Sequence, residues 1–163
     1  MIVTSCEKKI KKTEQVEQLE EVAPNSDTIE EVLTRIAESN LKIVAIAQKA
    51  LESKIQNNTK SILKETESNH IKLKNKIRKI AKDNFIIIPN TLYDTTTLKS
   101  FISEVNTKMY LKRLENSLIN ELTLYNSITA TSTNNELKEL SKEAIPIIQK
   151  DIDSIQKQQN LYH

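Results

Sequence analysis

A glutamate and a histidine three residues apart form the pattern most suggestive of chemistry in this sequence. The segment Glu67-Ser68-Asn69-His70 has the Glu-x-x-His spacing, which places a carboxylate and an imidazole on one side of a helix. Helical di-metal sites use this motif, but they need a second copy of it together with further glutamates. The only other histidine, His163, is the last residue of the sequence, so a complete di-metal site is not expected.

A smaller metal site is one interpretation of the polar residues expected on inward-facing helix surfaces. His70 and Asp151 both fall within apolar stripes, and Glu67 and Glu115 could flank them. One imidazole with carboxylates suits a single divalent cation whose shell is completed by water. Glu67, His70 and Asp151 are therefore the candidate metal ligands. The favoured alternative is a structural pair, in which Asp151 satisfies the hydrogen-bonding capacity of His70 without any metal or cofactor.

Cys6 is a second candidate for a chemical role, as a site of lipidation. Residues 3–6, Val-Thr-Ser-Cys, look like the bacterial lipobox, in which the cysteine after a small residue is lipidated. The segment before Cys6 is shorter than the basic and apolar regions that normally precede a lipobox. The charged residues 7–22 would provide a spacer, and acyl chains on Cys6 would hold a folded domain at a membrane. The alternative is a cytoplasmic protein in which the match is accidental.

The composition excludes several common classes of enzyme. Among the 163 residues there is no glycine, so neither a glycine-rich phosphate loop nor a glycine-flanked nucleophile elbow is present. The single cysteine excludes an intramolecular disulfide and any multi-cysteine zinc site. With two histidines and no glycine, the sequence offers no catalytic triad with an oxyanion loop. We therefore expect a protein that is not an enzyme.

The charge balance argues against a nucleic-acid partner. The formal net charge is only +2, with 24 basic and 22 acidic residues. A basic run from Lys72 to Lys82 lacks nearby aromatic residues for base stacking. We interpret this run as a solvated helix face, with binding of phosphates or anionic lipid head groups as the alternative. No stretch of about 18 apolar residues occurs that could cross a membrane as a helix.

Apolar residues recur at steps of three and four along four long segments, which predicts four amphipathic helices. Pro146 lies inside the last of them and is expected to kink it or to leave one carbonyl unpaired. The break after the first helix is expected at Asn57-Asn58. The helices are expected at about residues 27–56, 59–83, 104–130 and 136–159.

The longest connection joins the second and third predicted helices. Residues 85–89 are apolar and are expected to form an extended connection across the end of the bundle, followed by a short helical turn at 91–103. A crossover of this length between the second and third helices is typical of ferritin-like bundles. The predicted fold is therefore an all-α, ferritin-like four-helix bundle over residues 27–160, preceded by the charged tether 1–26.

Several short landmarks support a family resemblance over about residues 28–158. They are Ala37-Glu38-Ser39-Asn40, Asn69-His70, Tyr110-Leu111 and Ile145-Pro146. With these landmarks the chain resembles a family of bacterial envelope proteins known as domain of unknown function four-one-four-two. The resemblance implies a ferritin-like fold and export or lipid anchoring, with no established activity. Relatives often carry an inward-facing histidine on each of three helices. The matching positions here hold His70, Leu118 and Asp151, so at most part of such a metal site would be retained.

These patterns lead to three hypotheses about function. The leading one is a non-catalytic, membrane-tethered lipoprotein of the bacterial cell envelope, in the periplasm or at the outer membrane, with a structural, protective or binding role. The second is a ferritin-like metal-binding protein with a reduced site. The third is a cytoplasmic helical module that binds a protein partner through a face of the bundle or through the basic run.

Overall fold

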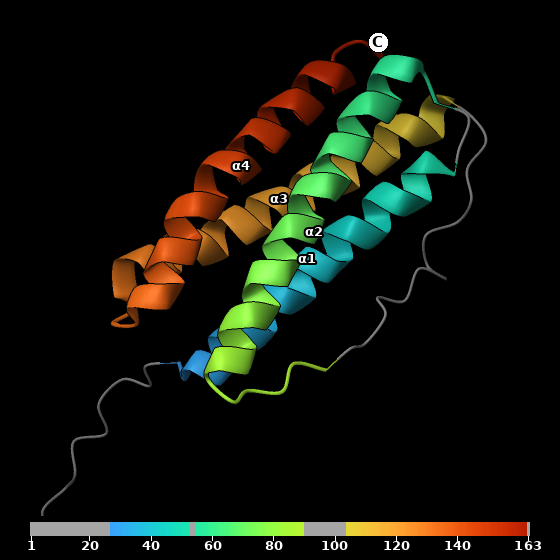
Figure 1. The fold of residues 1–163 in the computed structure, drawn as a ribbon. Helices are drawn as coiled ribbons and strands as arrows, with labels where there is room; N and C mark the ends of the chain where they lie inside the picture. Colours follow the sequence, from blue (N-terminus) through green and yellow to red (C-terminus); the bar gives the residue numbers. More distant parts are fainter. Residues whose placement is uncertain (1–26, 53–54, 90–103, 163) are drawn as a thin grey trace, which may run out of the picture.

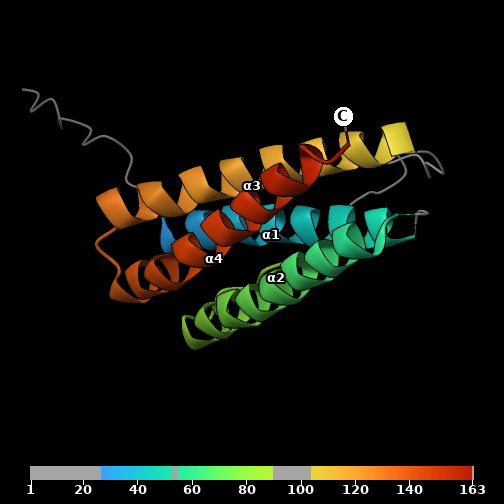
Figure 2. The same cartoon turned by 90° about the horizontal axis from the view of Figure 1, so that it is seen from above.

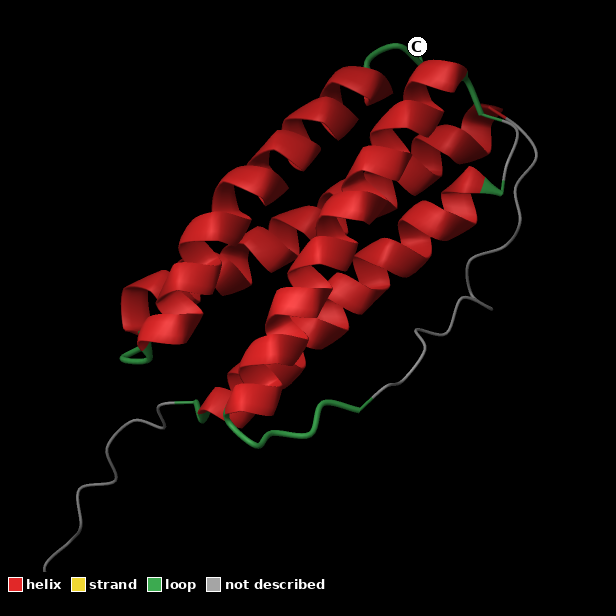
Figure 3. Ribbon diagram, in the orientation of Figure 1, coloured by secondary structure: helices red, strands yellow, loops and turns green. Residues whose placement is uncertain are grey.

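Four long helices make up the part of the chain that is described in a computed structural model, namely residues 27–52, 55–89 and 104–162 (Figure 1). Within these ranges no residue belongs to a strand (Figure 3). The predicted all-α four-helix bundle is therefore confirmed. The helices are α1 at Ile29–Leu51, α2 at Asn57–Asp83, α3 at Glu104–Thr131 and α4 at Asn135–Gln159.

Each helix has two neighbours around a common core. α1 packs beside α2 and α3, and α4 packs beside the same two helices, so α2 and α3 lie diagonally opposite each other. α2 ends and α3 begins at opposite ends of the bundle, and the two helices run in the same direction (Figure 1 and Figure 2). The end of α2 and the start of α3 are therefore separated by the length of the bundle, which agrees with the predicted crossover.

Aliphatic side chains from all four helices fill the core. Leu33, Leu73, Leu114 and Ile148 represent the four helices and are each at most 1% exposed. They belong to stripes at steps of three and four, which a helix with 3.6 residues per turn brings to one face. Burying such stripes is the main source of helix stability in a bundle, because isolated helices of this length are marginal in water.

A capping box begins α1. The Glu31 N–H donates to Oγ1 of Thr28 at 3.2 Å, and the Thr28 N–H donates to Oε2 of Glu31 at 2.8 Å. Asp27, the residue before this cap, forms an ion pair with Arg35. The start of the folded domain near residue 27 therefore follows from local side-chain chemistry.

The break between α1 and α2 differs from the sequence-based expectation. α1 ends at Leu51, and Asn57 and Asn58 are the first residues of α2 rather than a break. Gln56, which is extended, occupies the N-cap position. Asparagine is tolerated in the first turn because the N–H groups there have no partner within the helix. α4, by contrast, continues through Pro146 without ending.

The C-terminus of α2 closes with a Schellman motif that contains no glycine. The Ile86 N–H donates to the Ala81 carbonyl at 2.8 Å, and the Phe85 N–H donates to the Lys82 carbonyl at 3.1 Å. Phe85 has a φ of 57°, which is the left-handed conformation that glycine usually supplies at this position. A sequence without glycine therefore uses a strained phenylalanine to end this helix.

The segment after this motif is extended and lies against the bundle. Ile86 and Ile88 pack on the core, whereas Ile87 between them is exposed, as alternation along an extended chain requires. Residues 86–89 are extended as predicted, whereas Phe85 belongs to the turn that ends α2. The expectation that the segment crosses the end of the bundle is wrong, because Ile88 and Pro89 lie beside α1 and α2. The short helical turn predicted at 91–103 lies outside the described residues.

Candidate functional site

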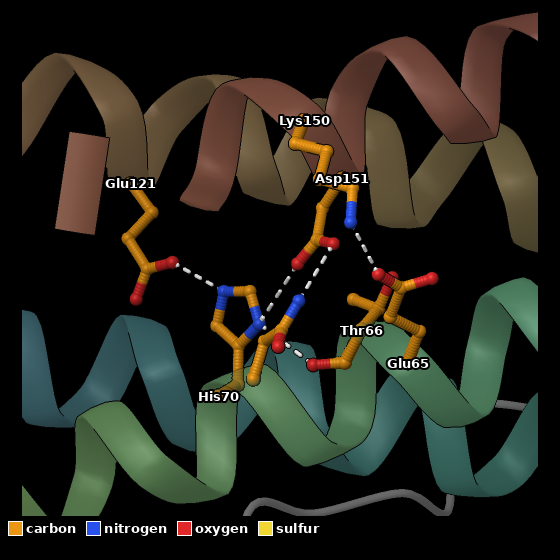
Figure 4. A network of polar contacts seen from close by, with 7 residues as sticks. Glu65, Thr66, His70, Glu121, Lys150 and Asp151 are labelled. Carbon is orange, nitrogen blue, oxygen red and sulfur yellow. Dashed lines mark hydrogen bonds and ion pairs between the residues drawn. The ribbon is translucent and has the colours of Figure 1, made fainter. Parts of the chain in front are cut away.

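The imidazole of His70 lies at the centre of a buried polar cluster in the middle of the bundle (Figure 4). Its side chain is 0% exposed. Nδ1 lies 2.9 Å from the carbonyl oxygen of Thr66, one turn earlier in α2, and Nε2 lies 2.8 Å from Oε2 of Glu121. Both ring nitrogens are therefore engaged, and the orientation of the ring is fixed by partners on either side.

The contact between His70 and Glu121 joins α2 to α3, which lie diagonally across the core. The carbonyl of Thr66 can only accept a hydrogen bond, so Nδ1 of His70 carries a proton and donates it. A second proton lies between Nε2 and the carboxylate of Glu121. The pair is neutral overall whichever of the two atoms holds this proton. A neutral pair avoids the large cost of an isolated buried charge.

Asp151 on α4 faces the other side of the imidazole (Figure 4). Its Oδ2 lies 3.6 Å from Nδ1 of His70, and its Oδ1 accepts a hydrogen bond from Nδ2 of Asn69 at 3.1 Å. Burial raises the pKa of Asp151 to about 6, against the attraction of His70 and the hydrogen bond from Asn69. On the solvent side of Asp151, Lys150 forms an ion pair with Glu65 at 2.7 Å.

Opposing effects set the charge of His70. Burial lowers the pKa of His70, but the hydrogen bond and the charge of Glu121, the carbonyl of Thr66 and the charge of Asp151 together raise it above its usual value. The positively charged ring is thus favoured by a carboxyl group on each side. The three side chains come from three helices, so their contacts tie α2, α3 and α4 together at this level of the core.

The structure brings together two of the three predicted metal ligands. Asp151 lies beside His70, but Glu67 lies at the edge of α2 and accepts a hydrogen bond from Nε2 of Gln48 at 2.8 Å. The expectation that Glu67 joins His70 is therefore wrong, because Thr66 occupies the inward position at that turn. One residue further along a helix points about 100° away from it.

Glu115, which was expected to flank the histidine, forms a separate polar contact with other residues. It accepts hydrogen bonds from Lys112 on α3 and from Gln156 and Gln159 on α4. Burial raises the pKa of Glu115, but these three hydrogen bonds outweigh burial and leave the pKa below its usual value. This contact ties α3 to α4 and does not reach the cluster around His70.

Glu121 is the residue that the sequence analysis missed. Apolar residues alone predict that Leu118, Leu122 and Tyr125 lie on the inward face of α3, yet Glu121 is 0% exposed while Leu122 is only partly buried. The signal was present in the spacing, because Leu118, Glu121 and Tyr125 follow one another at steps of three and four. A glutamate at an inward helix position, facing a buried histidine on another helix, is therefore the sequence pattern that predicts such a buried pair.

The imidazole of His70 lies between two carboxyl groups, Glu121 from α3 and Asp151 from α4. Glu121 and Asp151 approach different nitrogens of the imidazole, so the ring separates them. Among the described residues, no group of three or more His, Cys, Asp and Glu side chains is arranged to hold a metal ion. Metal binding by His70 and Asp151 stays a prediction. Cys6, the predicted lipidation site, lies outside the described residues.

A separate cavity of about 560 Å³ lies at the end of the bundle where α1 begins and α3 ends. Its lining includes Ile29, Ile36, Leu124 and Ile128, and none of the residues around His70. The polar cluster is therefore enclosed by the helices and is distinct from this hollow.

Comparisons with known proteins do not place the chain in a family. No family model matches it, and no curated protein or solved structure shows significant similarity to it. The resemblance to the bacterial envelope family of unknown function therefore stays a prediction.

Proposed function

We propose that this chain is a non-catalytic helical-bundle domain of the bacterial cell envelope, held at a membrane surface by a lipid on Cys6. The observation that carries the proposal is the order of three features along the chain. A lipobox-like cysteine comes first, a charged segment over residues 7–22 follows, and a bundle with its own capped start begins at residue 27. No helix in the described ranges is long and apolar enough to cross a bilayer.

The buried cluster supports a structural role for the reactive side chains in this domain. His70 and Glu121 are 0% exposed and Asp151 is 2% exposed, and the imidazole is hydrogen-bonded on both sides. Groups arranged in this way align helices, because a shift of one helix would leave a buried charge without a partner. The same-direction course of α2 and α3 supports a ferritin-like topology for the domain.

Metabolic labelling tests the membrane anchor directly. Cells that carry the gene with its native upstream sequence are grown with a radioactive fatty acid, and the protein is isolated with an antibody. We expect label in the wild-type protein and none in the Cys6→Ser variant, which should also move from the membrane fraction to the soluble fraction. Absence of label from the wild-type protein, or equal label in both proteins, would contradict the proposal.

A further inference from the structure

Several fully buried polar atoms in the middle of the bundle have no hydrogen-bond partner among the described residues. Two of them are on α1, where both Oδ1 and Nδ2 of Asn40 are unpaired. Two more are on α3, namely Oε1 of Glu121 and the hydroxyl of Tyr125. All three residues are 0% exposed. Leaving a buried donor or acceptor unpaired costs about 1–3 kcal/mol, so a set of such atoms indicates a missing partner.

The helix register places these three residues close together. Glu121 and Tyr125 are one turn apart on the same face of α3, and the charge of Glu121 acts on the Tyr125 hydroxyl. α1 and α3 run in opposite directions, and Lys49 interacts electrostatically with Tyr110. Asn40 precedes Lys49 by nine residues, and the ninth residue after Tyr110 is residue 119. Asn40 is therefore within about one turn of Glu121 along the bundle axis.

The unpaired oxygen of Glu121 points away from its histidine partner. Oε2 takes up the hydrogen bond with His70, and the other oxygen is directed away from the imidazole in Figure 4. Burial, together with the nearby charge of Glu121, raises the pKa of Tyr125 well above its usual value. The phenol therefore stays protonated and offers both a donor and an acceptor.

The donors and acceptors among these atoms determine what kind of molecule could bind between them. Asn40 presents an NH₂ donor and a carbonyl acceptor, Glu121 presents an acceptor, and Tyr125 can do either. A bound cation would satisfy only the acceptors and a bound anion only the donors. Water satisfies both, and buried waters in proteins typically make about three hydrogen bonds to groups of this kind. We propose that the bundle core binds at least one internal water molecule between Asn40 on α1 and Glu121 and Tyr125 on α3.

A crystal structure of the wild-type protein that resolves ordered solvent tests the proposal. We expect a solvent peak within about 2.7–3.2 Å of the Tyr125 hydroxyl and of at least one of the other two side chains. A peak with the short distances and the oxygen-only shell of a metal ion would overturn the assignment to water. A direct hydrogen bond between Asn40 and Glu121, with no peak between them, would overturn the proposal as a whole.

Magnetic relaxation dispersion of water nuclei tests the same site in solution, because it counts water molecules that stay bound longer than the protein takes to tumble. The nearly isosteric Tyr125→Phe variant and the Asn40→Leu variant should each lose the contribution of at least one long-lived water. Asn126→Leu is the matched control, since Asn126 is exposed on α3, and it should leave the count unchanged. An unchanged count in Tyr125→Phe would contradict the site, and the crystal structure decides even if Asn40→Leu fails to fold.

Discussion

Replacing Asp151 by asparagine should make the protein more stable at neutral pH. This gain in stability should disappear at acidic pH. The side chain of Asp151 is 3% exposed and lies between His70 and Asn69. Asparagine has nearly the same shape and can still accept the hydrogen bond from Asn69 through its carbonyl oxygen. The main change is therefore the removal of a carboxyl group that ionises with difficulty in this position.

The magnitude follows from the pKa of Asp151, which burial raises from 3.8 to about 6. Because the folded state holds the proton more tightly than the unfolded state, folding is favoured below pH 3.8, and this advantage is lost as the pH rises through about 6. One pKa unit corresponds to about 1.4 kcal/mol, so the ionised carboxylate costs up to about 3 kcal/mol at pH 8. The relative stability of the Asp151→Asn variant should improve by up to that amount between about pH 4 and pH 8.

Urea titrations of the wild type and the variant at several pH values measure this difference. In thermal unfolding, the same change corresponds to a relative shift in Tm of about 6–12 °C for a domain of this size. Asp153→Asn is the matched control, because Asp153 is an exposed residue of the same helix. A stability difference between Asp151→Asn and wild type that stays constant from pH 4 to pH 8 would contradict a raised pKa for Asp151 in the folded state.

Four further substitutions test other parts of the structure. His70→Ala leaves Glu121 buried without its partner and should lower the free energy of unfolding by about 3–5 kcal/mol in urea titrations. Glu121→Gln removes the charge that supports the imidazolium, so an NMR titration should show a lower pKa for His70 than in the wild type. Phe85→Gly relieves a left-handed phenylalanine that is 96% exposed, and should stabilise the protein by about 1 kcal/mol in the same titrations; a loss of stability would contradict that assignment. Leu114→Ala should lower the free energy of unfolding by about 2–5 kcal/mol, and a decrease under about 0.5 kcal/mol would contradict the place of Leu114 in the core.

The helices were predictable because the apolar stripes are long and regular. Leu73 in α2 and Leu114 in α3 fall on stripes of several turns, and burial of such a stripe dominates the choice between helix and other structures. Helix ends are less predictable, since they depend on single caps. Thr28 has a partner in Glu31 that spacing reveals, whereas Gln56 makes no side-chain cap, and the start of α2 at Asn57 had no comparable signal.

The buried cluster was only partly predictable. The inward positions of His70 and Asp151 followed from their own stripes, because each lies between aliphatic residues at helical spacing. The partnership with Glu121 depends on which helices face each other across the core, and periodicity within one helix carries no such information. Hydrophobicity alone places Leu122 on the inward face of α3, whereas the spacing from Leu118 and Tyr125 places Glu121 there. A buried glutamate can be predicted at such a position only when its hydrogen-bonding partner on the diagonal helix is known, because an unpaired buried carboxylate is costly.

Nitrogen NMR of the imidazole of His70 tests most directly the claim that the bundle closes around a hydrogen-bonded histidine. The spectrum would be recorded between about pH 5 and pH 8 and assigned with the His70→Gln and His163→Gln variants. We expect that Nδ1 of His70 keeps its proton throughout, that this proton exchanges slowly with water, and that the pKa of the ring lies above 6.5. A ring that titrates at or below 6.5, with Nδ1 losing its proton and exchanging freely, would contradict the buried contacts with Thr66 and Glu121.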